Sequence, residues 1–74
     1  MSRLRPVSSK ALCKLLTQLG FEKIRQKGSH AFYRHPDGRS TVVPIHAGEK
    51  IGKGLLHDIL KEIDLERNEY LKLI

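Results

Sequence analysis

The residues with the most evident chemistry lie in one stretch, from Lys27-Gly28-Ser29-His30 to His35-Pro36-Asp37-Gly38-Arg39. An ordinary imidazole titrates near about pH 6.5, so a histidine can take a proton from one oxygen and return it to another. Lysine and arginine neutralise phosphate, and an exposed aromatic ring can stack on an unpaired base. The stretch therefore predicts a surface that binds polyanions and can move a proton.

The residues after Ser29 have the alternation of a strand, whose side chains point to opposite faces in turn. Alternate residues form two sets, one for each face, and we assign the first set to solvent: His30, Phe32 and Arg34. The second set should face the core: Ala31, Tyr33 and His35. We expect Lys27 and Arg34 to contact phosphate, Phe32 to stack on a base, Gly28 to permit a turn or a close approach, and Ser29 to orient the loop.

His30 is the best candidate for acid–base chemistry, although by itself it also fits a polar sheet residue. Cleavage of RNA needs little more, because the ribose 2′-OH can act as the nucleophile. His46, after the next strand, is a second acid–base candidate or equally a polar strand end, and His57 is expected at the surface. One cysteine and four separated histidines make no CxxC or HxxxH pair, so we expect no metal and no cofactor.

Three short segments should form the sheet that positions these side chains. They are Phe21–Lys27, Ser29–His35 and Ser40–Ile45, each rich in β-formers and bounded by turn residues. Pro36 to Arg39 should form a type I turn, although His35-Pro36-Asp37 also spells the tripeptide that joins two helices in J-domain co-chaperones. In the third segment Thr41, Val43 and Ile45 should face the core, and Pro44 predicts a sheet edge or a position that needs no ladder hydrogen bond.

Two apolar stripes predict helices that cover this sheet. The first lies between Val7 and Gly20, with Ser8 or Ser9 as N-cap and Gly20 as the left-handed exit; its members are Leu12, Leu15, Leu16 and Leu19. Cys13, beside this stripe, should be a half-buried apolar residue. The loop Ala47–Lys50 leads to the second stripe, which comprises Leu56, Ile59, Leu60 and Ile63. A short helix, Glu66–Leu73, should then pack Tyr70, Leu71 and Ile74 against it.

The predicted fold is therefore α+β, in the order α-β-β-β-α with a short C-terminal helix, with the helices on one face of a three-stranded antiparallel sheet. The 74 residues carry a net charge of +6, which fits one small domain over residues 1–74. Residues 1–50 hold ten basic and three acidic residues, whereas residues 51–74 hold four and five. The +7 front predicts a phosphate-binding surface, and a merely solubilising charge is the alternative.

The absence of an apolar opening segment and the single cysteine predict a cytoplasmic protein without disulfides or a membrane span. Four segments also resemble the HicA (YcfA-like) family of toxins. They are Lys27-Gly28-Ser29-His30, His35-Pro36-Asp37-Gly38-Arg39, Val43-Pro44-Ile45-His46 and the run from Gly54-Leu55-Leu56 to Ile59-Leu60. Their order and spacing cover almost the whole chain.

This resemblance implies a double-stranded-RNA-binding-domain-like fold that acts as an mRNA-cleaving ribonuclease and is neutralised by a HicB-like antitoxin. The family's catalytic histidine lies in a Gly-Ser-His motif, so that role would fall to His30. Ala31 stands where the family often has a second histidine or another polar residue, which bears on substrate contacts. Asp64 stands where the family often has glycine. A non-catalytic RNA-binding module remains the alternative function.

Overall fold

The computed structural model describes residues 3–46 and 48–74; Ala47, the first residue of the expected loop, lies outside them, as do Met1 and Ser2. The elements follow in the order β1 (Val7–Ser8), α1 (Ser9–Gln18), β2 (Glu22–Lys27), β3 (His30–Arg34), β4 (Ser40–Pro44), β5 (Lys50–Ile51), α2 (Lys53–Glu62) and α3 (Arg67–Leu73). This order confirms the predicted α+β class and its double-stranded-RNA-binding-domain-like α-β-β-β-α series. No helix of the described part combines the length and apolar character needed to cross a membrane.

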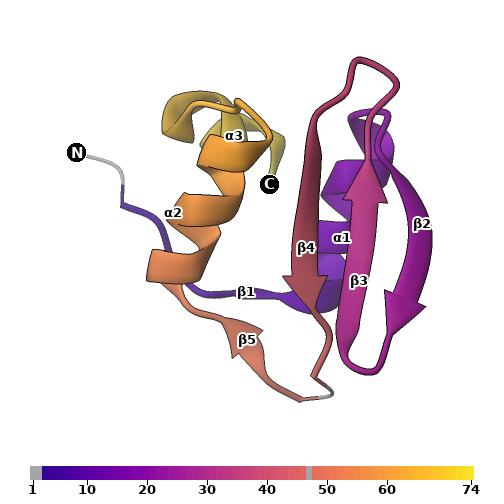
Figure 1. The fold of residues 1–74 in the computed structure, drawn as a ribbon. Helices are drawn as coiled ribbons and strands as arrows, with labels where there is room; N and C mark the ends of the chain where they lie inside the picture. Colours follow the sequence, from indigo (N-terminus) through magenta and orange to yellow (C-terminus); the bar gives the residue numbers. More distant parts are fainter. Residues whose placement is uncertain (1–2, 47) are drawn as a thin grey trace.

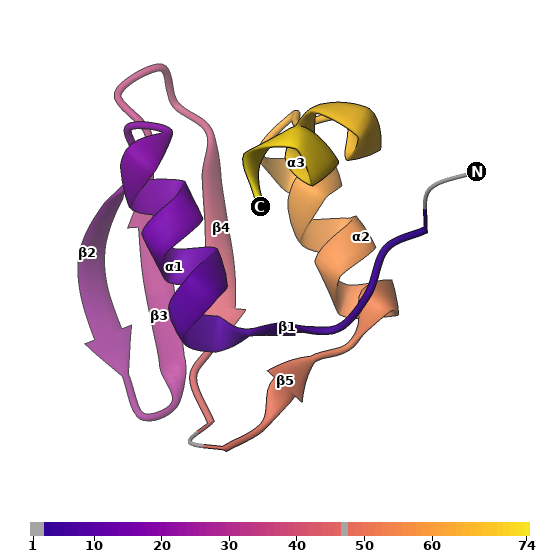
Figure 2. The same cartoon turned by 180° about the vertical axis from the view of Figure 1, so that it is seen from behind.

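The main sheet is antiparallel, with the strand order β2-β3-β4. Helix α1 lies behind it in Figure 1 and in front of it in Figure 2, so α1 covers one face. Helix α2 packs along β4, where the Thr41 hydroxyl donates a hydrogen bond to Oε1 of Glu62 at 2.6 Å. No helix covers the other face in either view. We call this uncovered side of β2, β3 and β4 the open face.

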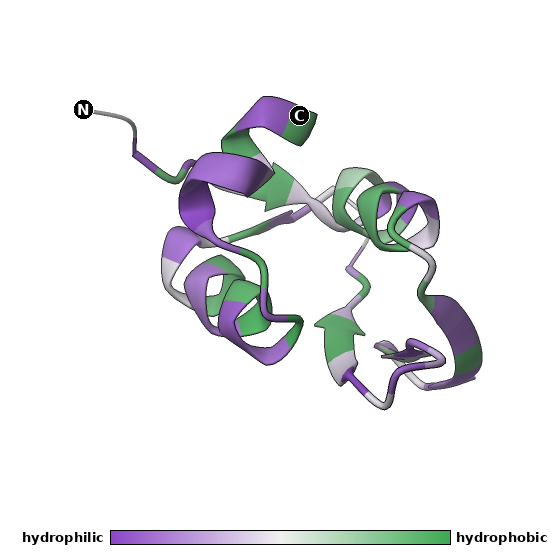
Figure 3. Ribbon diagram, turned by 90° about the horizontal axis from the view of Figure 1, so that it is seen from above, coloured by the Kyte–Doolittle hydropathy of each residue, from purple (hydrophilic) through white to green (hydrophobic). Residues whose placement is uncertain are grey.

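The core lies between the sheet and the helices. Strand β3 contributes Ala31 and Tyr33, and β4 contributes Thr41 and Val43, all of them buried. The helical stripes pack against them as predicted, with Leu19 only partly buried, and Figure 3 shows apolar residues of the helices turned towards the interior. Since side chains alternate along a strand, burial of these four residues leaves the intervening positions to the open face.

Helix α1 begins and ends at the predicted residues because its exposed backbone groups find partners there. The Ser8 hydroxyl accepts a hydrogen bond from the Ala11 amide at 3.1 Å. Gly20, with φ of +96°, lets the amide of Phe21 donate to the Leu16 carbonyl at 2.9 Å. Helix α2 ends in the same way, although its left-handed residue is Asp64, with φ of +57°.

Two details differ from the sequence prediction. Lys50 is not a loop residue: with Ile51 it forms β5, which pairs antiparallel with β1 and so links the segment that leads into α1 to the segment that leads into α2. Ile74 does not pack in the core, and the prediction that it would was wrong, because its side chain remains 64% exposed. Ile74 lies just past α3, whereas Tyr70, within α3, is buried as predicted.

Candidate nucleic-acid interface

The loop between β2 and β3 brings Lys27 and His30 together. These two residues are register partners at the end of the hairpin, separated only by Gly28 and Ser29. Gly28 has φ of +58°, the value that the first central residue of a tight two-residue hairpin turn requires. The Gln26 side chain donates to the Gly28 carbonyl at 3.2 Å, and the Ser29 carbonyl accepts from the Ile45 amide. The loop is thus tied to strands on both sides.

Strand register arranges the open face in three rows. Directly opposite residues have Cβ atoms about 4.5–5.5 Å apart, so members of one row are neighbours. Each row runs from β2 through β3 to β4: Lys27, His30 and Pro44; Arg25, Phe32 and Val42; Glu22, Arg34 and Ser40. The structure therefore brings together on one face the predicted residues Lys27, His30, Phe32 and Arg34.

His30 is exposed and lies in the first row, between a lysine and a proline. Pro44 carries no charge and has no backbone N–H. The charged neighbour of His30 in this row is therefore Lys27. The Ser29 carbonyl accepts a hydrogen bond from the Ile45 amide, and His46 follows Ile45 just past the end of β4. His46 is exposed. The imidazole of His30 is thus open to a ligand, with a cation beside it.

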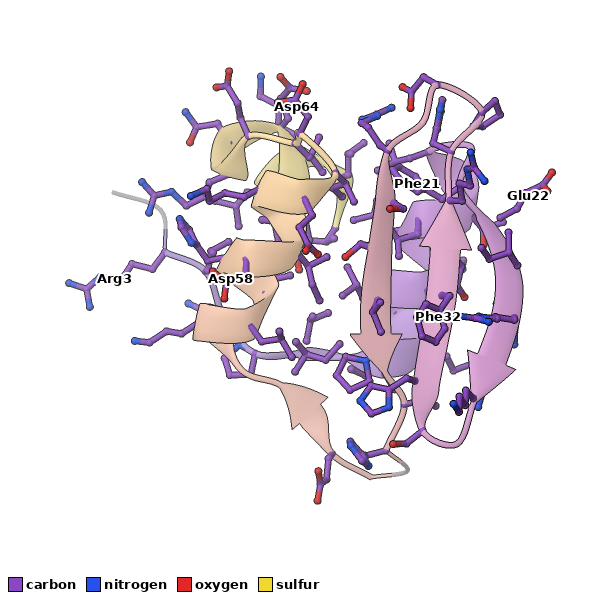
Figure 4. The ribbon with its side chains drawn as sticks, viewed as in Figure 1. Arg3, Phe21, Glu22, Phe32, Asp58 and Asp64 are labelled. Carbon is purple, nitrogen blue, oxygen red and sulfur yellow. The ribbon has the colours of Figure 1, made fainter. Side chains whose placement is uncertain are left out.

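Phe32 is half-buried in the second row, and Figure 4 shows its ring in front of β3, on the side away from α1. The guanidinium carbon of Arg25 lies 4.6 Å from the centre of this ring, within the range of a cation–π contact. Arg25 was not among the residues predicted from sequence. Phe32 is therefore one half of an aromatic–cation pair rather than an isolated ring.

Arg34 is exposed in the third row, four residues along β3 from His30. At about 3.4 Å per residue this is about 14 Å along the strand, so the two side chains face different parts of an extended ligand. Its neighbour Glu22 is the acidic member of the face and points away from Phe32 in Figure 4. Each row thus contains one cation, and the carboxylate of Glu22 lies in the third row, away from His30.

The motif His35-Pro36-Asp37-Gly38-Arg39 forms a turn, as predicted, and braces the fold. The Gly38 amide donates to the His35 carbonyl at 2.9 Å, and Arg39 donates to the Ile63 carbonyl at the end of α2. The Arg39 backbone amide, 3.0 Å from Oδ1 of Asp37, holds the pKa of that carboxyl below its usual range, and the Arg39 side chain adds to the effect.

His35 packs edge-on against Phe21, with ring centres 5.0 Å apart, on the core side of the sheet. As a neutral imidazole its Nδ1 accepts from the Asp37 amide at 3.1 Å, and when protonated it can donate to the carboxylate oxygen at 3.0 Å. His35 therefore stabilises the turn and is separate from the open face.

Two further sequence expectations are resolved by burial. Ala31 faces the core and is fully buried, so the expectation that this position bears on substrate contacts through its side chain is wrong. His57 is exposed on α2, as predicted, and Cys13 is half-buried. Within residues 3–46 and 48–74, no group of three or more histidine, cysteine or acidic residues is placed to hold a metal ion.

Sequence reasoning missed Arg25 and Gln26. Alternation from Lys27 would have placed Arg25 on the same face as Lys27, but contact with Phe32 depends on the pairing of two strands across an irregularity between Lys23 and Arg25. Gln26 is the register partner of Ala31, and its side-chain amide supports the hairpin by donating to the Gly28 carbonyl. No periodicity within one strand reports either contact.

The segment that contains this interface matches a known family. No curated protein sequence matches the chain. A family model described as "HicA toxin of bacterial toxin-antitoxin" matches residues 9–65, which run from the start of α1 to just past the end of α2. The match includes the hairpin with Lys27 and His30, the turn from His35 to Arg39, and the whole open face. The chain belongs to the HicA toxin family of bacterial toxin–antitoxin systems, and an antitoxin is therefore its expected partner.

Proposed function

We propose that this chain is an endoribonuclease toxin that cleaves mRNA in the cytoplasm, with His30 as general acid and base. The observation that carries the proposal is the exposure of His30 on the open face beside Lys27, with Phe32 and Arg34 following on the same face. A histidine, cations and an aromatic ring on one uncovered surface are what an extended RNA strand requires. Gly28 and Ser29 form the turn of the hairpin that presents Lys27 and His30.

The proposed reaction needs no metal ion, because the RNA carries its own nucleophile. The ribose 2′-oxygen attacks the adjacent phosphorus while neutral His30 takes the hydroxyl proton. The bond from phosphorus to the 5′-oxygen breaks, and that oxygen takes a proton from an acid, for which His46 is the second candidate. Lys27 stabilises the negative charge that develops on the phosphate oxygens. The products are a 2′,3′-cyclic phosphate and a 5′-hydroxyl.

The first test replaces His30, with His57→Ala as the matched control. Loss of a proton-transfer group slows a reaction by about 10²–10⁴-fold, so His30→Ala should cleave RNA that much more slowly and should not inhibit growth. His57 is exposed on α2, away from the open face, so its variant should cleave normally. Circular dichroism checks that both variants fold. A folded His30→Ala protein with near-native activity would remove His30 from the mechanism.

Excess EDTA is the second test, and cleavage should persist in it. Activity that disappears with the chelator and returns only with Mg²⁺ or Mn²⁺ would overturn the imidazole mechanism. The same gels distinguish the alternative function, since a non-catalytic RNA-binding module on this basic face would shift RNA and never shorten it.

We further propose that the antitoxin is HicB-like and that it covers the open face. Such a partner would mask His30 and the phosphate contacts together, and acidic groups on it would speed association. Charge reversal at Lys27 and Arg34 should weaken binding of both RNA and antitoxin, whereas reversal at Lys61 and Lys72 on the helices should weaken neither. If both pairs of variants behaved alike, inhibition by direct masking would have to be abandoned.

A further inference from the structure

A hollow crosses the open face beside Phe32 and is separate from the His30 row. Its volume is about 400 Å³, within the roughly 300–1,000 Å³ typical of ligand pockets. Its lining on the sheet includes Ile24, Phe32, Arg34 and Val42. Ile24 is 56% exposed and is the single apolar residue of β2. The hollow thus combines an apolar and aromatic wall with a cation, Arg34, and with polar residues that include Ser40 and Thr41.

The charges around the hollow would orient a bound nucleotide. Arg25 lies on the Phe32 ring and Arg34 lines the hollow itself, so the side formed by β2 and β3 attracts phosphate. The opposite wall contains Glu62 of α2, whose carboxylate is fixed by the 2.6 Å hydrogen bond from Thr41. A carboxylate repels phosphate but tolerates the N–H groups of a base. A nucleotide would therefore place its phosphate at the arginines and direct its base towards α2.

We propose that Arg25 and Phe32, with Ile24 and Val42, form a subsite for one unpaired base of single-stranded RNA, in which Arg25 also contacts the phosphate. This inference rests on the proposed ribonuclease function and adds to it the form of the substrate and a residue that selects it. A base inside a duplex is paired and stacked, so it cannot lie against the Phe32 ring. The subsite therefore favours a single strand over a duplex of the same sequence.

The experiment measures binding of a short 2′-O-methyl RNA, which lacks the attacking hydroxyl, as a single strand and as a duplex. One base is replaced by 2-aminopurine, whose fluorescence falls when it stacks on a ring. Base–aromatic stacking corresponds to about 5- to 150-fold in affinity. Phe32→Leu should weaken single-strand binding by that factor, remove the fluorescence quenching and leave duplex binding unchanged. Arg25→Lys, which keeps the charge and loses the planar group, should lose part of the preference for the single strand.

Lys23→Ala is the matched control, because Lys23 is also exposed on β2 but pairs with the core-facing Tyr33. It should retain the native preference for the single strand. If Phe32→Leu and Arg25→Lys kept native affinity and quenching while RNA was still cleaved, the subsite would be overturned and the proposed function would stand. Variants that lost only antitoxin binding would also overturn it. Failure of the native protein to bind or cleave any RNA would instead overturn the function itself.

Discussion

The salt dependence of RNA binding reports how many cations of the open face contact phosphate. The three rows contain three such side chains, Lys27, Arg25 and Arg34. Each phosphate neutralised on a single strand contributes about −0.7 to the slope of log affinity against log salt, so three contacts give about −2.1. Raising the salt concentration fourfold should then weaken binding by about 18-fold. The 2′-O-methyl RNA, followed by fluorescence anisotropy, provides the measurement without cleavage.

Removing one cation should change this slope by a known amount. Lys27→Gln or Arg34→Gln should each reduce it to about −1.4, so that the same fourfold rise in salt costs only about 7-fold in affinity. Measurement at pH 8, where an ordinary imidazole is neutral, removes any contribution of histidine charge. Lys61→Gln and Lys72→Gln, which alter exposed lysines of α2 and α3, should leave the native slope.

Two results would refute this reasoning. An unchanged slope in Lys27→Gln and Arg34→Gln would show that RNA lies elsewhere on the protein. An equal fall in slope for Lys61→Gln would show that the charge acts as a diffuse field rather than through contacts at the open face.

Three predictions concern stability. Asp64→Gly should raise the free energy of unfolding in urea by about 0.5–1 kcal/mol, because Asp64 adopts φ of +57° and places a negative charge at the C-terminus of α2; a decrease would contradict this account. Tyr70→Phe should leave that free energy unchanged or raise it by up to about 1 kcal/mol, since within the described residues the buried Tyr70 hydroxyl has no hydrogen-bond partner; a loss above about 1 kcal/mol would reveal a partner. Burial, and then the neighbouring thiol of Cys13, raise the pKa of Tyr33 to about 12, so the contribution of Tyr33 to stability is complete below pH 10 and is lost as the pH rises from 10 to 12. Between pH 8 and 11, Tyr33→Phe should therefore lose about 1 kcal/mol less stability than the native protein, and equal losses would refute the assignment.

The predicted parts of the site are those that depend on local geometry. Alternation placed His30, Phe32 and Arg34 on one face because a pleated strand cannot do otherwise, and burial of Ala31 and Tyr33 confirms it. The ends of α1 followed from the chemistry of one serine and one glycine. Such features are encoded within a few residues, so a single sequence can show them.

The missed parts depend on contacts between distant segments. Arg25 meets Phe32 only through the register of two strands, and Glu62 reaches the hollow only through the packing of α2 on β4. Strands β1 and β5 have two residues each, too few for any periodicity to appear. Ile74 was misplaced because it lies past the last residue of α3, where helical periodicity no longer decides which way a side chain points. To predict these features, one would need to know which strands and helices contact each other in the folded protein.

The exposure of His30 has a consequence for how the proposed ribonuclease would work. Electrostatic stabilisation of a transition state is strongest where water is excluded, and the open face by itself excludes little. In the proposed mechanism the RNA would therefore supply part of the enclosure, with one nucleotide in the hollow at Phe32 and its neighbour over His30. An antitoxin would need no change in the toxin fold to inhibit it, because occupying the hollow alone would deny the RNA its hold beside His30.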